Sequence, residues 1–173
     1  LYEGLVQNDI FDADFGIVPA IAERWSVSDD ALTWTFHLRD NAKWNNGEPV
    51  TAEDFRFSWR RAMLPDLASD YVKMFLAIEG AEDFYAKREQ ALEAFADLEF
   101  ESSNEREQAA EQLWIDTKAW FDNMVGVKAP DPRTLVVTLK QPVPYFLDLT
   151  AFAVFYPVYQ PLVERYERPD PTT

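Results

Sequence analysis

Residues 32–55 read LTWTFHLRDNAKWNNGEPVTAEDF and place a strand, a polar loop and the start of a helix in immediate succession. Trp34, Phe36 and Leu38 alternate with polar residues near the beginning of this stretch. Because successive side chains of a strand point to opposite faces, the alternation predicts a strand over residues 33–39 with one buried and one solvated face.

A helix is predicted where this stretch ends. Residues 51–54, TAED, have the Ser/Thr-x-x-acid form of a capping box, in which the first and last side chains satisfy backbone N–H groups of the first turn. Apolar residues then recur at helical spacing as far as Met63, and Pro65 follows. We therefore expect a helix over residues 52–63.

Two further strands complete the predicted sheet. Residues 24–28 alternate in the same way as residues 33–39, and the two aspartates between these runs supply turn chemistry, so the pair predicts a β-hairpin. Residues 134–140 predict a third strand. We expect residues 130–132, PDP, to bound it upstream, because proline cannot donate to a sheet.

A second, shorter helix is predicted after the first. Residues 70–78 are apolar at positions i, i+3, i+4 and i+7, which is helical spacing, and Gly80 would end this helix.

Residues 82–122 differ from the rest of the chain in composition. They hold 12 acidic and 4 basic residues, a net charge of −8 out of −15 for the whole chain, and neither Gly nor Pro. Two apolar stripes at helical spacing, separated by SSN at 102–104, predict an inserted αα-hairpin. The predicted fold class is α+β, with an antiparallel sheet packed against helices and the helical hairpin attached.

The composition also narrows the classes of function. A net charge of −15 repels phosphate backbones and anionic lipid surfaces, so nucleic-acid binding is disfavoured. The chain has no cysteine and a single histidine, His37, which excludes thiolate and multi-histidine metal sites. Its glycines are scattered singly, without a phosphate-binding motif, and no run approaches the roughly 20 apolar residues of a membrane span. We expect no cofactor and no membrane-spanning segment.

Few side chains point to catalysis. His37 falls on the solvated face of its predicted strand, and the adjacent acids of the capping box fit helix capping better than a catalytic carboxylate pair. Trp44, in a turn-rich loop, is expected to anchor that loop to the core. Tyr71 follows the polar, irregular residues 64–70, and composition leaves a core residue and a ligand contact equally open.

Several blocks of the chain resemble one family, the substrate-binding proteins of ABC importers for oligopeptides, dipeptides and nickel. The blocks are LYEGLV at 1–6, PAIAERW at 19–25, the whole of 32–55, GVKA at 126–129, and TLVVTL at 134–139 with PVPYF at 142–146. Their order and spacing hold over residues 1–80 and 123–168, so the resemblance covers nearly everything except the acidic helical stretch.

The resemblance implies a fragment of a larger periplasmic binding protein with a type II-like architecture of two lobes around a cleft. Residues 1–173 would be mainly its second domain with short flanks of the first, and residues 82–122 an insertion. It implies a protein without enzymatic activity that captures extracytoplasmic oligopeptides for delivery to the permease subunits of an ABC transporter. The peptide would be held by its main chain and its termini. We expect a monomer, periplasmic or otherwise extracytoplasmic, with a lipid anchor as one option and any signal sequence upstream of Leu1.

By position, Tyr71 matches the tyrosine that this domain lends to the ligand in oligopeptide binders, within ASDY at 68–71. Ser69 and Asp70 complete the expected ligand-binding set, with Asp70 in place of the family's more usual proline. A dipeptide, a nickel chelate and an oligosaccharide are alternative ligands within the family.

Two alternatives come from other classes of protein, a carboxylate-pair hydrolase and a helical protein-interaction module. Two interpretations of the acidic stretch 82–122 also stay open. It is either a peripheral cover of apolar surface or a docking surface for a basic partner or a second copy of the chain.

Overall fold

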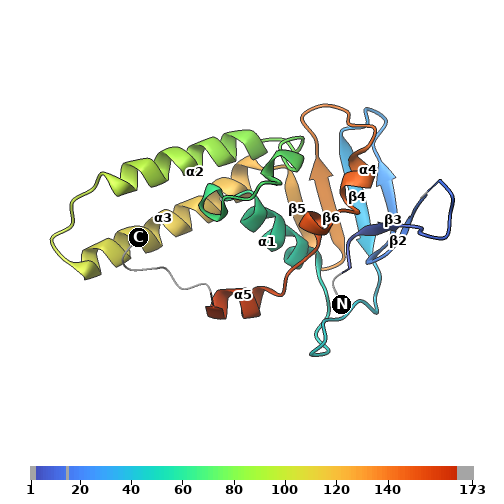
Figure 1. The fold of residues 1–173 in the computed structure, drawn as a ribbon, viewed down its shortest axis with the longest axis horizontal. Helices are drawn as coiled ribbons and strands as arrows, with labels where there is room; N and C mark the ends of the chain where they lie inside the picture. The colour runs from blue at the N-terminus through green and yellow to red at the C-terminus, as the bar shows by residue number, and fades with distance from the viewer. Residues whose placement is uncertain (1–2, 15, 167–173) are drawn as a thin grey trace.

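The computed structural model describes residues 3–14 and 16–166. Within them, a four-stranded antiparallel sheet lies toward one end of the molecule, and the long helices extend toward the other end (Figure 1). The strands follow the order β3–β4–β6–β5, with bounds Ala22–Val27 (β3), Thr33–Leu38 (β4), Thr134–Thr138 (β6) and Val127–Asp131 (β5). The predicted hairpin, the third strand and the α+β class are confirmed.

Strand β4 is an inner strand of the sheet, and one of its faces is buried and apolar. Trp34, Phe36 and Leu38 are buried, whereas the residues between them are half-buried. β4 pairs antiparallel with β3 on one side and with β6 on the other, so that Thr35 lies between Ser26 and Val136. The predicted alternation of a buried and a solvated face is confirmed.

The turn between β3 and β4 is closed by side chains. The Ser28 hydroxyl donates to the Asp30 carboxylate at 2.5 Å, and the Leu32 N–H donates to the same oxygen at 3.0 Å. These hydrogen bonds favour the charged form and lower the pKa of Asp30. Since the folded-state pKa is the lower one, this carboxylate stabilises the turn at neutral pH and loses that effect as the pH falls through the lowered pKa.

Pro130 lies inside strand β5, contrary to the expectation that it bounds the sheet. β5 is an edge strand, and its pairing with β6 shifts register between Lys128 and Asp131. Proline is accommodated there because a bulged edge position needs no N–H for the ladder. The proline therefore marks an edge of the sheet instead of its end.

Helix α1 (Ala52–Ala62) packs against β5 and β6. Thr51 and Asp54 form the predicted capping box: the Thr51 N–H donates to the Asp54 carboxylate at 2.7 Å, and the Asp54 N–H donates to the Thr51 hydroxyl at 3.4 Å. Phe55 and Trp59 carry the buried face of the helix. The helix predicted from the capping box is confirmed.

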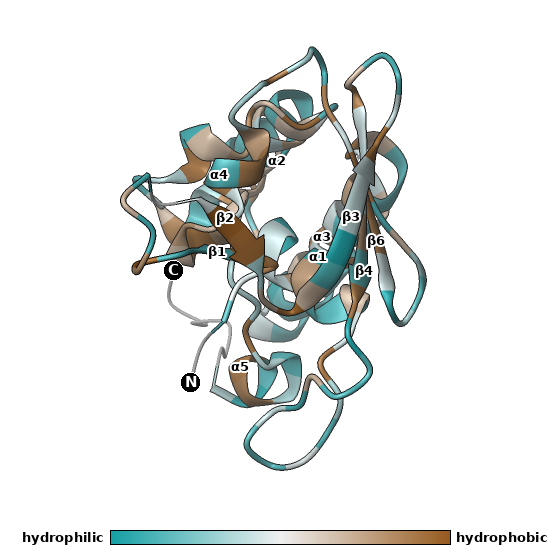
Figure 2. Ribbon diagram, turned by 90° about the vertical axis from the view of Figure 1, so that its right-hand side faces the viewer, coloured by the Kyte–Doolittle hydropathy of each residue, from teal (hydrophilic) through white to brown (hydrophobic). Residues whose placement is uncertain are grey.

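Several smaller elements surround this core. β1 (Val6–Asn8) and β2 (Ile17–Pro19) form a separate antiparallel pair beside the main sheet (Figure 2). They were not predicted, because three residues are too few to show an alternation. After β6 come α4 (Phe146–Leu149), the 3-10 helix η3 (Ala153–Phe155) and α5 (Gln160–Tyr166).

The acidic stretch forms the predicted helical hairpin. α2 (Ala81–Ala96) and α3 (Ser103–Met124) run side by side and project away from the sheet (Figure 1). Ser102 caps α3 by accepting a backbone N–H of its first turn at 3.2 Å. Phe84 and Phe121 are buried at the base of the hairpin, with their ring centroids 5.4 Å apart. No helix in the described parts of the chain, α3 included, is both long and apolar enough to cross a membrane.

The connection from α1 to α2 is not the α-helix predicted over residues 70–78. It contains two short 3-10 helices, η1 (Pro65–Leu67) and η2 (Val72–Met74), joined by turns. Phe75 and Ile78 are nevertheless fully buried, as their spacing indicated. The periodicity identified the buried side chains but not the backbone conformation.

Residues 77–79 do not continue a helix because their backbone pairs with the end of β6. The Glu79 N–H donates to the Thr138 carbonyl at 2.9 Å, and the Lys140 N–H donates to the Ala77 carbonyl at 3.0 Å. Backbone groups that pair with a strand cannot also bond along a helix, so this long-range pairing overrides the local helical preference.

Gly80 begins a helix and does not end one. It is the N-cap residue of α2 and has a φ of 69°, in the left-handed region. A Cβ atom at this position would lie 1.9 Å from the carbonyl oxygen of Met124, the last residue of α3. Glycine is therefore what lets the two ends of the hairpin meet at its base.

Replacing Gly80 by alanine should destabilise the chain by about 2 to 4 kcal/mol, because a left-handed alanine costs about 1 to 2 kcal/mol and the clash is with backbone. Gly47 is the matched control. It also has a positive φ, of 89°, but its added Cβ would meet nothing within 4 Å. Gly47→Ala should therefore cost only about 1 kcal/mol. Urea unfolding of the three proteins makes the comparison, and equal losses for the two variants would contradict this account of the hairpin base.

Candidate functional site

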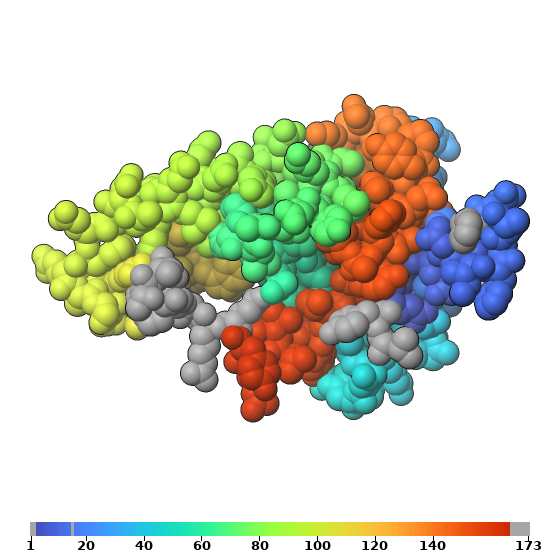
Figure 3. All heavy atoms as spheres, viewed as in Figure 1, coloured from blue at the N-terminus to red at the C-terminus, as the bar shows by residue number. Residues whose placement is uncertain are grey.

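The predicted ligand residues lie in the connection between α1 and α2, residues 64–79, which we call the 64–79 loop. Tyr71 is 57% exposed, Asp70 is exposed, and Ser69 is half-buried. Figure 3 shows the loop, in green, at the molecular surface beside the orange-red segment that contains α4 and η3. This exposure excludes the interpretation of Tyr71 as a core residue and leaves that of a ligand contact.

A succession of turns orients these side chains. Ala68 has a φ of 45°, and its N–H donates to the Pro65 carbonyl at 2.9 Å to close η1. The Tyr71 N–H then donates to the Ser69 hydroxyl at 3.3 Å, and the Val72 N–H donates to the Ser69 carbonyl at 3.2 Å. Ser69 therefore fixes the backbone of Tyr71 at the start of η2.

Three buried aromatic residues, Trp59, Phe75 and Phe155, support the loop from beneath, and we call them the aromatic floor. The ring centroid of Phe75 lies 4.3 Å from that of Phe155 and 6.0 Å from that of Trp59. The Trp59 indole N–H donates to the Phe155 carbonyl at 2.8 Å. The aromatic floor joins α1, the loop and η3, so the exposed Tyr71 lies on a loop whose inner side is tightly packed.

Two further aromatic residues are exposed on the segment that supplies η3. Tyr145, just before α4, is 60% exposed, and Phe152, just before η3, is 54% exposed. Exposed aromatic side chains next to a candidate site offer surface to apolar and planar groups. Sequence reasoning did not single out either residue, although Tyr145 stands in the quoted PVPYF block.

The helical hairpin contacts the loop from the side through one ion pair. Arg88 of α2 is 8% exposed and donates to the Asp66 carboxylate of η1, with a shortest N···O distance of 2.7 Å. It also donates to the Thr117 hydroxyl of α3 at 2.9 Å. Asp66 and Arg88 are 22 positions apart, and local patterns do not reveal such a pair.

A second buried charge holds the base of the hairpin against α1. The guanidinium of Arg60 lies 5.6 to 5.9 Å from the ring centroids of Phe57, Trp114 and Phe121. Burial, with the nearby Arg56 as a smaller cause, lowers the pKa of Arg60. These cation–π contacts attach α3 to α1 independently of Arg88.

The side chains considered for catalysis either take part in structural hydrogen bonds and ion pairs or lie far from the loop. His37 pairs with Thr134, at the opposite end of β6 from the loop. Asp54 is held in its capping box, and Glu53 forms an ion pair with Arg56 at 2.9 Å. Within residues 3–14 and 16–166 no group of three or more His, Cys, Asp or Glu side chains is arranged to hold a metal ion. This arrangement does not favour the carboxylate-pair hydrolase.

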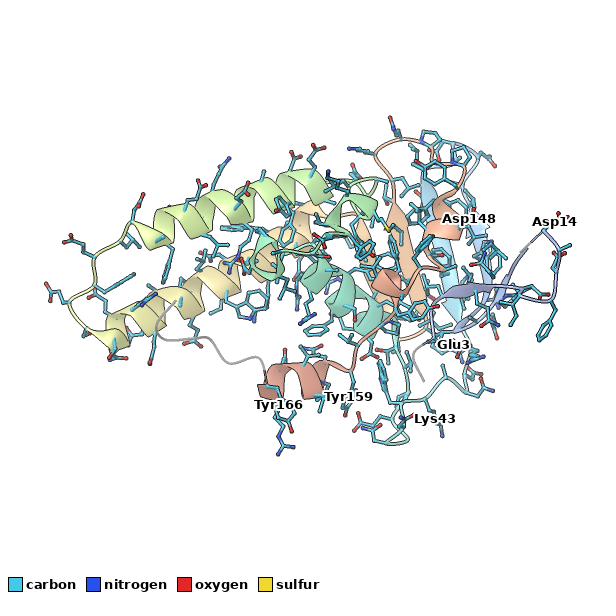
Figure 4. All side chains as sticks on the ribbon, in the orientation of Figure 1. Glu3, Asp14, Lys43, Asp148, Tyr159 and Tyr166 are labelled. Atoms are coloured by element: carbon cyan, nitrogen blue, oxygen red, sulfur yellow. The ribbon has the colours of Figure 1, made fainter. Side chains whose placement is uncertain are left out.

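A cavity of about 380 Å³ lies beneath the loop that carries Trp44 and is lined on its other side by α5. The ring centroids of Trp44 and Tyr159 are 5.5 Å apart. The Tyr159 hydroxyl donates to the Glu48 carboxylate at 2.6 Å, and this hydrogen bond raises the pKa of Tyr159. Figure 4 shows Lys43 and Tyr159 at this edge of the molecule. Trp44 anchors its loop, as expected from the sequence.

Comparison with known proteins places this geometry in context. The model of the bacterial extracellular solute-binding proteins, family 5 Middle, matches residues 16–172. The periplasmic murein peptide-binding protein MppA of Escherichia coli (strain K12) is 38% identical over 165 residues, which are 95% of this chain and 24% of that protein. The periplasmic oligopeptide-binding protein OppA of the same organism is 34% identical over 168 residues, 96% of this chain and 24% of that protein.

A solved structure agrees with these relatives. The crystal structure of Haemophilus influenzae OppA in complex with the peptide RPPGFSPFR superimposes with a TM-score of 0.70 and 35% identity, and the match covers 96% of this chain and 26% of that one. The chain therefore spans about a quarter of the length of the relatives it matches.

Shortening Trp59 to phenylalanine tests the aromatic floor. The change removes the hydrogen bond to the buried Phe155 carbonyl and leaves a cavity, so Trp59→Phe should cost about 2 to 4 kcal/mol of unfolding free energy. Trp25 on β3 is only half-buried, and Trp25→Phe, its control, should cost less than about 1 kcal/mol. Chemical denaturation measures both, and a loss at Trp59 no larger than at Trp25 would contradict the role of the floor.

Proposed function

Because the chain belongs to the bacterial extracellular solute-binding proteins of family 5, we propose that it is one domain of the substrate-binding component of an ABC importer that captures oligopeptides outside the cytoplasm. The observation that carries the proposal is the match of 96% of the chain, at 35% identity, to an oligopeptide-binding protein solved with a peptide. The importer's permease subunits would be its partners.

The chain covers only about a quarter of the length of its relatives, which supports a binding site formed by more than one domain. Residues 1–173 would be mainly the second domain with short flanks of the first, and the rest of the longer protein would supply the opposing lobe. The exposure of Tyr71 on an open surface is consistent with a ligand clamped only when two lobes meet. Affinity would then arise on closure and not on either lobe alone.

Within the 64–79 loop, Tyr71 would be the main contact with the peptide. A tyrosine presents an apolar ring and a hydroxyl that both donates and accepts, which suits a peptide main chain of any sequence. Ser69 would fix its backbone, and the exposed Asp70 would attract a peptide ammonium group. One side chain that reads the backbone is compatible with broad specificity.

The proposal describes capture without chemistry. The peptide would leave unchanged, and the protein would work as a monomer in the periplasm or at the outer face of the membrane, with a lipid anchor as one option. A murein peptide is a second candidate ligand, favoured by the 38% identity to a murein peptide-binding protein.

Replacing Tyr71 by alanine in the longer protein should weaken peptide binding about tenfold, the loss expected for one aromatic contact worth about 1.4 kcal/mol. Thermal stability should not change, because the side chain is exposed. Tyr166, 71% exposed on α5, is the matched control, and Tyr166→Ala should leave affinity unchanged. Titration calorimetry with the peptide RPPGFSPFR and with a murein tripeptide gives the affinities and separates the two candidate ligands. Equal affinities for the two variants would remove Tyr71 from the site.

The 173-residue chain by itself should bind these peptides weakly or not at all, because the opposing lobe is missing. Calorimetric titration of the chain with either peptide, beside the longer protein as positive control, makes the comparison. Micromolar affinity of the isolated chain, where a dissociation constant above about 1 mM is expected, would contradict a site formed by closure.

A further inference from the structure

We propose that Arg88 on the helical hairpin is a positioning residue for the candidate ligand loop and acts through Asp66 on the conformation of Ser69 to Tyr71. The hairpin would then be part of the binding apparatus, beyond the two interpretations of cover and docking surface. The effect on peptide affinity rests on the proposed function, whereas the effect on loop conformation does not.

The buried guanidinium of Arg88 joins three elements, which are α2, η1 and α3. Its Nη2 donates to Asp66 Oδ2 at 2.7 Å, and its Nε lies 3.2 and 3.3 Å from the two oxygens of the same carboxylate. Its Nη1 donates to the Thr117 hydroxyl at 2.9 Å. A planar guanidinium that meets a carboxylate with two nitrogens fixes orientation as well as distance. Arg88 therefore sets the place of η1 relative to both helices.

Asp66 is close enough along the chain to transmit this constraint. Only Leu67 and Ala68 separate it from Ser69, and Ala68 is held at a φ of 45°. A left-handed alanine costs about 1 to 2 kcal/mol and persists only where the surroundings define it. Because the carboxylate is fixed just before this residue, release of Asp66 would let Ala68 relax and turn Ser69 and Tyr71 away from their present direction.

The attachment of the hairpin does not depend on Arg88. Phe84 and Phe121 pack at its base, Arg60 stacks on α3, and Lys140 pairs with Glu82 at 3.1 Å. The Thr117 hydroxyl also has its own acceptor, the Leu113 carbonyl, at 2.7 Å. Loss of the Arg88 side chain should therefore leave the hairpin in place and release mainly the loop.

Five variants of the longer protein test the inference. Asp66→Asn and Arg88→Met each remove the ion pair, and a double variant combines the two changes. Arg88→Lys keeps the charge without the planar fork. Glu82→Gln is the matched control, because it removes a different ion pair of α2, with Lys140, and leaves Arg88 in contact with Asp66 and Thr117. Hydrogen exchange of residues 66–72 reports the loop, and calorimetry with RPPGFSPFR, or the murein tripeptide if that binds instead, reports affinity.

We expect exchange of residues 66–72 to become about tenfold faster in Arg88→Met and Asp66→Asn, and peptide affinity to fall about fivefold to tenfold. The double variant should be no worse than either single variant, since both remove one interaction. Arg88→Lys should recover part of the affinity, and Glu82→Gln should behave like the unaltered protein.

Faster exchange confined to α2 and α3, with residues 66–72 and the affinity unchanged, would overturn the inference and leave Arg88 a helix-packing residue. Additive losses in the double variant would also overturn it. If the unaltered longer protein binds neither peptide, the proposed function fails, and hydrogen exchange alone then decides whether Arg88 positions the loop. Because Asp66 is partly exposed, Asp66→Asn keeps the test available if Arg88→Met does not fold.

Discussion

The burial of Phe75 beside an exposed Tyr71 is the constraint on which the candidate site depends. Phe75 packs between Trp59 and Phe155 in the aromatic floor, and residues 77–79 pair with the end of β6. A segment held from beneath by side chains and from one edge by backbone has little freedom to move. Tyr71 can therefore point into solvent and still keep a defined direction, as a contact that meets its ligand on closure requires.

We relate the helical hairpin to ligand binding through its contacts with the 64–79 loop and not through its acidic surface. Its acidic residues suggested a docking surface, but the contacts that we propose to act on the 64–79 loop are those of the buried Arg88 with Asp66 and Thr117. The Arg88 side chain is buried and the Asp66 side chain is 31% exposed, so salt screens this ion pair less than it screens the exposed acidic residues further along the helices. The hairpin can thereby stiffen the loop while most of its surface stays in solvent.

The sequence was sufficient for features that local physics determines. Alternation identified β4, and the capping box located the start of α1. The sequence was insufficient where distant parts of the chain meet. Residues 70–78 do not form the predicted α-helix because residues 77–79 pair with the end of β6, and Pro130 fits only because β5 is a bulged edge. Tyr71 came from family resemblance, since its local pattern fitted a core residue equally well.

A crystal structure of the longer protein with a bound peptide would test the central claim most directly. The account predicts a peptide held between two lobes, with the Tyr71 side chain in contact with its main chain and the Arg88–Asp66 pair intact at the side of the loop. A peptide bound without contact to residues 69–71, or enclosed wholly within residues 1–173, would contradict it.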